Sequence, residues 1–198
     1  MLDKRMIKPI HTTSKKKVNI FIGEYYASRE PAVIKTLLGS CVAACLYDRI
    51  NRIGGMNHIL LPGKADLKEM DDPSRYSINA MEILINSMMK LGSERGQIIA
   101  KVFGGASVIQ GISPGKAVGP KISEFVVSFL KNEGIKISGS DLGGFKSRTI
   151  FFHTDTGDVF LKRRDSMKSK FNEHAIKEQK EIKEFYDNLK IKNDVTFF

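Results

Sequence analysis

The stretch TLLGSCVAACLYD (residues 36–48) is followed closely by IGGMNHILLP (residues 53–62). Residues 42–48 have the composition of a β-strand. The second stretch is an apolar run that ends at Pro62, because proline cannot continue a hydrogen-bonded ladder. The polar residues 48–51 between the two runs suit a short turn. Together the two stretches predict an antiparallel β-hairpin, from which the rest of the chain can be placed.

Four other segments have the apolar composition of strands. They are residues 18–28, 98–103, 148–154 and 158–163. The stretch ISGSDLGG (residues 137–144) is rich in glycine and serine, so we expect it to be a turn-rich connection between elements.

Two helices are predicted from apolar residues that recur at spacings of three and four. The first carries Ile78, Met81, Leu84, Ile85, Met88 and Leu91, and the second carries Ile122, Phe125, Val126, Phe129 and Leu130. Strands that come in hairpins and helices that come separately favour an α+β fold. We therefore expect a layered α/β sandwich with antiparallel β-hairpins rather than a parallel doubly wound sheet.

The bulk properties favour one domain. The chain has 198 residues, of which 41% are hydrophobic, which is enough for one core and too little for two well-buried domains. No run approaches the roughly 18 apolar residues needed to cross a bilayer. The polar, basic start also lacks the apolar stretch of a secretory signal. We therefore expect a cytoplasmic protein that is not embedded in a membrane.

The net charge of +10 lies mainly at the two ends of the chain. Residues 1–17 carry +5 and residues 162–198 carry +3, so residues 18–161 carry only +2. We expect a basic disordered lead, a folded domain and a charged C-terminal helical extension over these three ranges. No aromatic stacking pattern accompanies the basic ends, so no nucleic-acid partner is expected.

Cys41 and His58 are the residues of the hairpin best suited to chemistry. A four-residue turn at residues 48–51 would pair residues whose numbers sum to 99, and these two have that sum. Directly paired side chains have Cβ atoms about 4.5 to 5.5 Å apart, which lets a thiol reach an imidazole. A turn of three or five residues would instead put the two side chains on opposite faces.

A cysteine beside a histidine is a candidate nucleophile, because the imidazole takes the thiol proton and leaves a reactive thiolate. Cys41 follows Gly39 and Ser40, where the backbone N–H groups of a turn can bind an oxyanion. Such a site must be open to its substrate. We therefore expect Cys41 to border a narrow groove, with Gly54 and Gly55 leaving room for the substrate.

Other interpretations of these residues stay open. A cysteine in an apolar strand is more often inert packing, which we expect of Cys45 because it lacks the preceding Gly-Ser pair. Zinc binding by Cys41, Cys45 and His58 would need a second close pair of ligands, and the sequence offers none. His153 lies among apolar residues, which suggests a structural role. We expect neither a metal nor a cofactor.

Four motifs resemble the chemoreceptor glutamine deamidase family, CheD. They are TLLGSCVAACLYD, IGGMNHILLP, AKVFGGAS and DLGG, and they occur in the family's order within roughly residues 18–161. The resemblance implies a layered α/β sandwich similar to the catalytic domains of deamidating bacterial toxins. It also implies that Cys41 is the nucleophile, His58 the general base and Thr36 the third residue of the site.

The resemblance further implies the reaction and its partners. The family converts glutamine to glutamate on the cytoplasmic helices of methyl-accepting chemotaxis receptors, so we expect a thioester at Cys41 and a role in chemotactic adaptation. The family also binds the phosphatase CheC. Phe103, Gly104 and Gly105 are candidate contacts for that partner, although a tight strand end would explain them equally well. The alternative function is a regulatory binding partner of CheC with little catalysis of its own.

Overall fold

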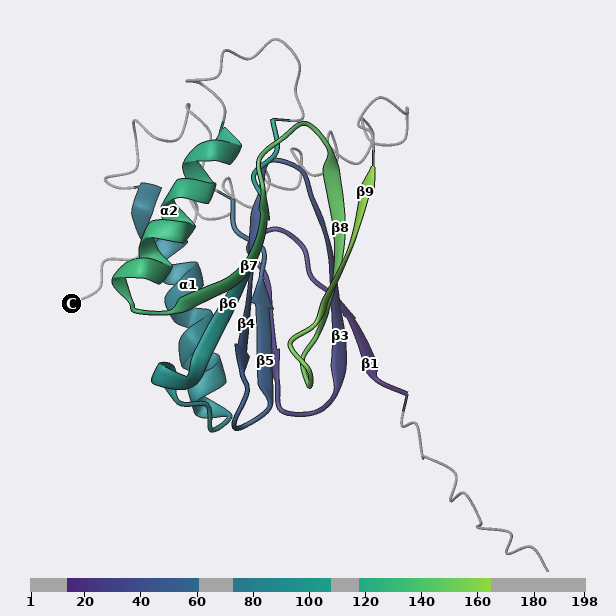
Figure 1. The fold of residues 1–198 in the computed structure, drawn as a ribbon, viewed down its shortest axis with the longest axis vertical. Coiled ribbons are helices and arrows are strands. Elements are labelled where there is room, and N and C mark those ends of the chain that lie inside the picture. Colours follow the sequence, from purple (N-terminus) through teal and green to yellow (C-terminus); the bar gives the residue numbers. More distant parts are fainter. Residues whose placement is uncertain (1–13, 61–72, 108–117, 165–198) are drawn as a thin grey trace, which may run out of the picture.

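The computed structural model describes residues 14–60, 73–107 and 118–164, which form three layers (Figure 1). Two helices cover one face of a five-stranded sheet, and a four-stranded sheet lies against its other face. This architecture confirms the expected α+β class and the layered arrangement. The likeness to toxin domains stays a prediction.

The five-stranded sheet has the order β2-β5-β4-β6-β7. Its strands are β2 (Tyr25–Ser28), β5 (Ile53–Asn57), β4 (Val42–Asp48), β6 (Ile98–Gly104) and β7 (Lys136–Leu142). Strand β4 lies in the centre, antiparallel to both neighbours, and all of its residues are buried. The predicted hairpin therefore forms the middle of the fold.

The four-stranded sheet has the order β1-β3-β8-β9. Its strands are β1 (Lys16–Asn19), β3 (Ala32–Leu38), β8 (Ser147–His153) and β9 (Val159–Arg164). Strands β8 and β9 form a second hairpin, whereas β1 with β3 and β6 with β7 pair in parallel. Both sheets are therefore mixed, with antiparallel hairpins at their centres or edges.

The helices α1 (Pro73–Lys90) and α2 (Val118–Asn132) bury their apolar faces against the five-stranded sheet, and a short 3-10 helix, η1 (Arg95–Gln97), precedes β6. The fully buried predicted positions are Met81, Leu84, Ile85, Met88, Ile122, Val126 and Leu130. Leu91 was expected on the same face, but α1 ends one residue earlier and Leu91 is 37% exposed. Helix α2 supplies the long crossover that the parallel pair β6–β7 requires.

Side chains of β4 alternate between two apolar cores, as the period of a strand requires. One core, beneath the helices, includes Val42, Ala44 and Leu46, and the other, between the sheets, includes Cys41, Ala43, Cys45 and Tyr47. The candidate nucleophile therefore faces the space between the two sheets.

The hairpin forms with a different register from the predicted one. Asp48 remains paired with Ile53, so the turn covers residues 49–52 and paired residues sum to 101 instead of 99. The Asp48 carboxylate explains the shift, because it accepts hydrogen bonds of 2.9 Å from the backbone N–H groups of Ile50 and Asn51. The carboxylate closes the turn from the last residue of the strand, as an Asx-turn does.

The corrected register keeps Cys41 and His58 on one face of the hairpin. The register differs from the predicted one by two residues, and only a shift by an odd number of residues would turn one side chain to the opposite face. The two residues are diagonal neighbours instead of a direct pair, because the register puts Ala43 opposite His58. Diagonal neighbours in a sheet are still within reach of long or aromatic side chains.

Strand β7 lies where the sequence predicted a turn-rich connection. It pairs in parallel with β6 at the edge of the sheet, and its register shifts between Ala100 and Lys101. Its residues alternate between exposed and half-buried positions. A polar edge strand with an internal glycine has little of the composition by which strands are recognised, which explains the wrong prediction.

Gly54 and Gly55 do not open a groove, as the sequence suggested, but allow close packing on both faces of β5. A Cβ atom on Gly54 would lie 2.6 Å from the Thr154 backbone, in the turn that follows β8, and one on Gly55 would lie 2.8 Å from the Leu84 side chain of α1. Both glycines are buried. They bring the three layers together at the centre of the fold.

The described strands extend slightly beyond residues 18–161. Strand β1 begins at Lys16 and β9 ends at Arg164. The expected disordered lead falls mostly on residues 1–13, and the expected C-terminal helix on residues 165–198, both outside the described residues, so that division of the chain stays a prediction. No helix in the described part of the chain is long and apolar enough to cross a membrane.

We expect Gly54→Ala to lower the free energy of unfolding by about 1–3 kcal/mol, because the new methyl group meets backbone that cannot move aside easily. Chemical denaturation followed by circular dichroism measures the change. Gly96→Ala is the matched control, since a Cβ atom there would meet nothing within 4 Å. Equal stability of the two variants would contradict the role of Gly54 in packing the sheets together.

Candidate active site

The structure brings Thr36 and His58 together across the two sheets. Thr36 lies in β3 of the four-stranded sheet, and His58 follows β5 of the five-stranded sheet. The Thr36 Oγ1 and His58 Nδ1 atoms are 2.8 Å apart, and both residues are buried. Cys41 precedes β4, lies on the same face of the hairpin as His58 and belongs to the apolar core between the sheets. The three predicted site residues therefore gather between the sheets, at one end of the hairpin.

The backbone of His58 is held from one side by the segment before β2. The His58 N–H donates to the Glu24 carbonyl and the His58 carbonyl accepts from the Gly23 N–H, both at 2.9 Å. On the other side, the next residue, Ile59, exchanges two backbone hydrogen bonds with Val42, of 2.7 and 3.0 Å. His58 is thus fixed between two strands although it lies just beyond the end of β5.

The Thr36 hydroxyl selects one tautomer of the His58 ring. Its single proton is donated to the Ile20 carbonyl, 2.8 Å away, and a carbonyl oxygen can only accept. The hydroxyl must then accept from His58 Nδ1, which therefore carries the ring proton. In the neutral ring this leaves Nε2 unprotonated and able to accept a proton. This tautomer is the one that a general base acting through Nε2 would need.

Burial keeps the His58 ring neutral. Removal of the imidazole from water lowers its pKa from 6.5 to about 3. A histidine that is neutral at physiological pH has the protonation state that a general base needs before reaction. The imidazolium formed during reaction would need a negative charge beside it, such as a thiolate.

Cys41 is more enclosed than the sequence predicted. The residue is 3% exposed and His58 is 2% exposed, so neither side chain lines an open groove in this structure. The chain bends at Gly39 and Ser40 before it reaches Cys41, as expected, and Ser40 is half-buried. Approach of a substrate to the Cys41 thiol would therefore require the surroundings of Cys41 to open.

Gly104 and Gly105 support the backbone of Cys41. The Gly105 N–H donates to the Cys41 carbonyl at 2.8 Å, and a Cβ atom on Gly104 would lie 2.1 Å from the same oxygen. Both glycines have positive φ angles, 115° and 66°, which other residues rarely adopt. Phe103 is 8% exposed and packs in the inter-sheet core. These contacts explain the residues structurally, and their predicted role in partner binding stays a prediction.

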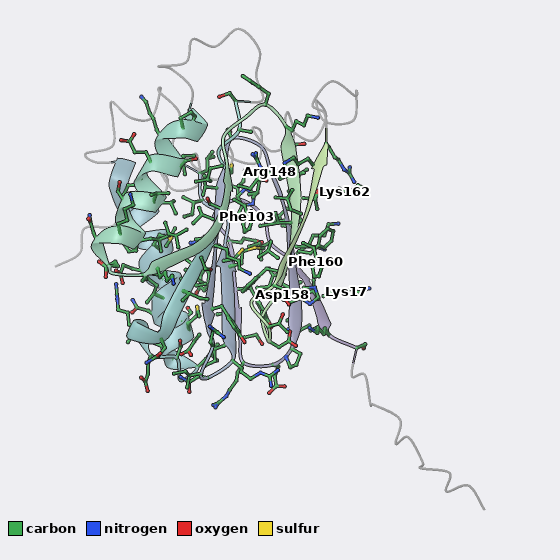
Figure 2. All side chains as sticks on the ribbon, viewed as in Figure 1. Lys17, Phe103, Arg148, Asp158, Phe160 and Lys162 are labelled. Carbon is green, nitrogen blue, oxygen red and sulfur yellow. The ribbon has the colours of Figure 1, made fainter. Side chains whose placement is uncertain are left out.

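Arg148 and Asp141 join the sheets near this support and were missed by the sequence analysis. Arg148 lies in β8 and donates to the Asp141 carboxylate of β7 at 2.7 and 2.9 Å. It also donates to the Gly143 carbonyl at 2.7 Å, and the Gly143 N–H donates to Gly104 at 2.9 Å. Figure 2 shows Arg148 near Phe103 at one end of the sandwich. The motif DLGG contains Asp141, but no pattern in the sequence indicated its partner.

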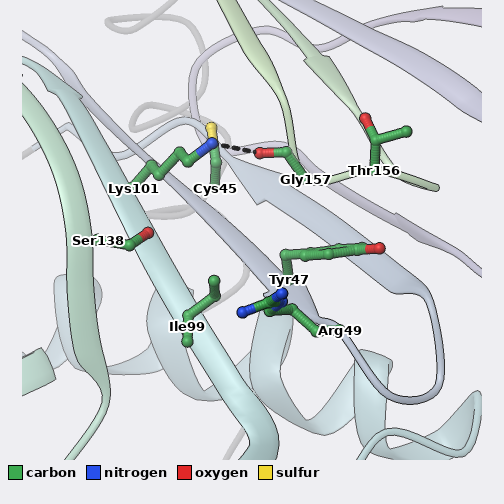
Figure 3. A pocket seen from close by; sticks show the side chains of 8 residues that line it. All are labelled: Cys45, Tyr47, Arg49, Ile99, Lys101, Ser138, Thr156 and Gly157. Atoms are coloured by element: carbon green, nitrogen blue, oxygen red, sulfur yellow. Dashed lines mark hydrogen bonds between the residues drawn. The ribbon is translucent and has the colours of Figure 1, made fainter.

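Cys45 has the surroundings of an inert thiol. It lines a cavity of about 190 Å³ together with Tyr47, Ile99 and Lys101 (Figure 3). Burial raises the pKa of the Cys45 thiol well above its ordinary range, and the nearby Lys101 ammonium group offsets only part of this effect. A thiol that stays protonated is a poor nucleophile. Cys45 therefore has the structural role expected of it.

The other candidate residues have structural partners. His153 lies 3.0 Å from the Lys15 ammonium group and packs edge-on against Phe160, with ring centroids 5.3 Å apart. Within residues 14–60, 73–107 and 118–164, no three His, Cys, Asp or Glu side chains are grouped in a way that could hold a metal ion.

Fold and site together define an α+β protein that holds a cysteine, a histidine and a threonine between two sheets, residue types that can form a nucleophile, a base and a residue that orients the base. Residues 60–163 match the family described as CheD chemotactic sensory transduction. The chain belongs to this family, as its similarity to curated members also shows.

Three relatives from different bacteria illustrate that similarity. The chain is 45% identical over 147 residues to the probable chemoreceptor glutamine deamidase CheD 2 of Chromobacterium violaceum, covering 74% of this chain and 73% of the relative. It is 41% identical to the corresponding CheD of Hahella chejuensis, covering 90% and 83%. It is 39% identical to CheD 1 of Shewanella oneidensis, covering 91% and 87%.

Solved structures show only a weak likeness. The hypothetical protein YfiH of Bacillus licheniformis aligns with a TM-score of 0.40 and 12% identity, over 60% of this chain and 50% of that one. The Neisseria meningitidis protein NMB0706 aligns with a TM-score of 0.39 and 11% identity, over 66% and 63%. These values are too low to define the fold.

We expect the protein to lose stability as the pH falls from about 6.5 toward 3. The folded His58 ring stays neutral in this range, whereas the ring in the unfolded chain binds a proton. Protons therefore favour the unfolded state, by about 1.4 kcal/mol for each pH unit per histidine. Chemical denaturation between pH 5 and 6.5 measures this change of the free energy of unfolding with pH, in a range where most carboxylates no longer titrate.

His58→Asn is the matched variant, because asparagine keeps an N–H donor near Thr36 and does not titrate. It should flatten the slope between pH 5 and 6.5, whatever its stability at pH 7. An unchanged slope would show that His58 titrates normally in the folded protein and would contradict its burial in the neutral form.

Proposed function

We propose that the protein deamidates glutamine side chains on methyl-accepting chemotaxis receptors, with Cys41 as nucleophile and His58 as general base. The named relatives support the reaction and the substrate class. The observation that carries the mechanism is the hydrogen bond of 2.8 Å between Thr36 and His58, since it leaves the other ring nitrogen ready to take a proton. Hydrolysis of a receptor amide to an acid fits a role in chemotactic adaptation.

In the first half of the reaction, His58 Nε2 takes the proton of the Cys41 thiol, and the sulfur attacks the carboxamide carbon. The C=O electrons move to oxygen, and backbone N–H groups at the bend of Ser40 and Cys41 bind this oxyanion. The tetrahedral intermediate collapses with cleavage of the C–N bond. His58 returns its proton to the leaving nitrogen, which departs as ammonia and leaves a thioester on Cys41.

In the second half, His58 takes a proton from a water molecule that attacks the thioester carbonyl. Cleavage of the C–S bond gives glutamate, and the proton on His58 returns to the Cys41 sulfur. The overall change is amide plus water to acid plus ammonia, so no oxidant, metal or cofactor is required. Thr36 holds the Nδ1 proton throughout, as the third member of a triad does.

The second candidate function is that of a regulatory binding partner of the phosphatase CheC, with little catalysis of its own. Gly104 and Gly105 support the Cys41 backbone and Phe103 precedes them, so a partner that contacts this segment would act close to the site. We propose a cytoplasmic location, because the receptor segments named as substrates lie there. A likeness to toxin deamidase domains would fit the same chemistry.

We expect Cys41→Ala to abolish deamidation of a receptor cytoplasmic fragment, because no other side chain can form the thioester. Mass spectrometry of the fragment detects each converted glutamine as a gain of about 1 Da, the difference between an amide and an acid.

Cys45→Ala is the matched control, because Cys45 lies on the same face of the hairpin as Cys41. It should keep most of the activity and lower the free energy of unfolding by about 1–2 kcal/mol, because it enlarges an existing cavity. Equal loss of activity in both variants would contradict the assignment of the nucleophile.

A further inference from the structure

A tight turn immediately before β2 holds the backbone of the candidate base. The turn covers residues 21–24, and the Glu24 N–H donates to the Phe21 carbonyl at 3.0 Å. Gly23 has a φ angle of 78°, the positive value that the third position of a type II turn requires. The Glu24 side chain closes the turn a second time, because its carboxylate accepts from the Phe21 N–H at 2.9 Å.

Three backbone groups of this segment fix His58 and its partner. The Gly23 N–H and the Glu24 carbonyl hold the His58 backbone, each at 2.9 Å. The Ile20 carbonyl, next to the turn, accepts the proton of the Thr36 hydroxyl. The same short segment therefore sets the position of the imidazole and the direction of the hydroxyl that selects its tautomer.

We propose that Glu24 is a positioning residue for His58, acting through this turn. The inference rests on the proposed deamidase function, but it concerns a residue outside the cysteine, histidine and threonine of the site. Glu24 is exposed, so burial does not explain its presence. Its carboxylate is bound to the backbone at the start of the turn, where it fixes the direction in which the chain leaves Ile20.

Loss of the Glu24 carboxylate should change the tautomer of the His58 ring while the protein stays folded. Without this acceptor the Phe21 N–H turns toward water, and the Ile20 carbonyl no longer holds the Thr36 proton in one direction. The hydroxyl can then donate to His58 Nδ1, which moves the ring proton to Nε2. A ring protonated at Nε2 cannot accept the thiol proton of Cys41 at that atom.

The experiment compares Glu24→Ala, Glu24→Gln and Glu124→Ala in the full chain. Glutamine keeps a side-chain oxygen that can accept from the Phe21 N–H. Glu124 lies on the exposed side of α2, away from the site, and controls for the loss of one carboxylate. The readouts are kcat and KM for a receptor fragment, and the imidazole ¹⁵N chemical shifts of His58, assigned by comparison with His58→Asn.

Wild type should show a protonated Nδ1 and an unprotonated Nε2. Glu24→Ala should mix the two tautomers and lower kcat by about tenfold at unchanged KM, a part of what a general base contributes. The fall in kcat should be at least three times smaller for Glu24→Gln than for Glu24→Ala, and the kcat of Glu124→Ala should match that of wild type. Unchanged tautomers and kcat in Glu24→Ala, or equal losses in Glu24→Ala and Glu24→Gln, would overturn the proposal.

Gly23→Ala tests the same turn without changing any charge. A Cβ atom there would meet nothing within 4 Å, so the substitution acts only through the positive φ angle. It should reproduce the tautomer mixture of Glu24→Ala, and a wild-type ¹⁵N spectrum would count against the turn. These spectra need no substrate, so they separate failure of this proposal from failure of the deamidase function, which would appear as inactive wild type with the expected tautomer.

Discussion

The hydrogen bond between Thr36 and His58 is the interaction on which the site depends, because it crosses from one sheet to the other. Thr36 can reach His58 only if the sheets pack closely, and Gly54 provides that close approach beside the Thr154 backbone. The same bond determines which ring nitrogen is free of a proton. The close packing of the two sheets and the tautomer of the His58 ring therefore depend on the same hydrogen bond. Burial between the sheets also keeps the imidazole neutral.

The candidate nucleophile is supported in a similar way, by contacts outside the three site residues. Gly104 and Gly105 pack on the Cys41 backbone, and the ion pair of the buried Arg148 with the half-buried Asp141 holds the neighbouring loop against them. Removing one partner of such a pair is costly, because it leaves the other charge uncompensated in the protein. Two separate supports, this one and the turn at residues 21–24, thus hold the backbones of Cys41 and His58. These supports leave Cys41 enclosed, so some of the residues around it must move before a substrate can reach the thiol.

Much of the architecture could be predicted from the sequence, because apolar spacing reports which faces are buried. The central hairpin, both helices and the meeting of Thr36 with His58 followed from residues or from family resemblance. The predicted register was wrong by two residues. The Asp48 carboxylate moves the turn by accepting backbone hydrogen bonds, and composition alone does not reveal such bonds. Strand β7 and the role of Glu24 depend on pairing between distant segments, so local patterns carried no signal for them.

The central claim, a covalent thioester on Cys41, is tested most directly by trapping it with hydroxylamine during deamidation of a receptor fragment. Hydroxylamine attacks a thioester far faster than an amide, so an acyl-enzyme must divide between water and this second nucleophile. The account predicts a receptor hydroxamate whose share rises with hydroxylamine concentration, while total consumption of glutamine stays constant if acylation limits the rate. Conversion to glutamate with no hydroxamate at any concentration would contradict it and favour direct attack by water.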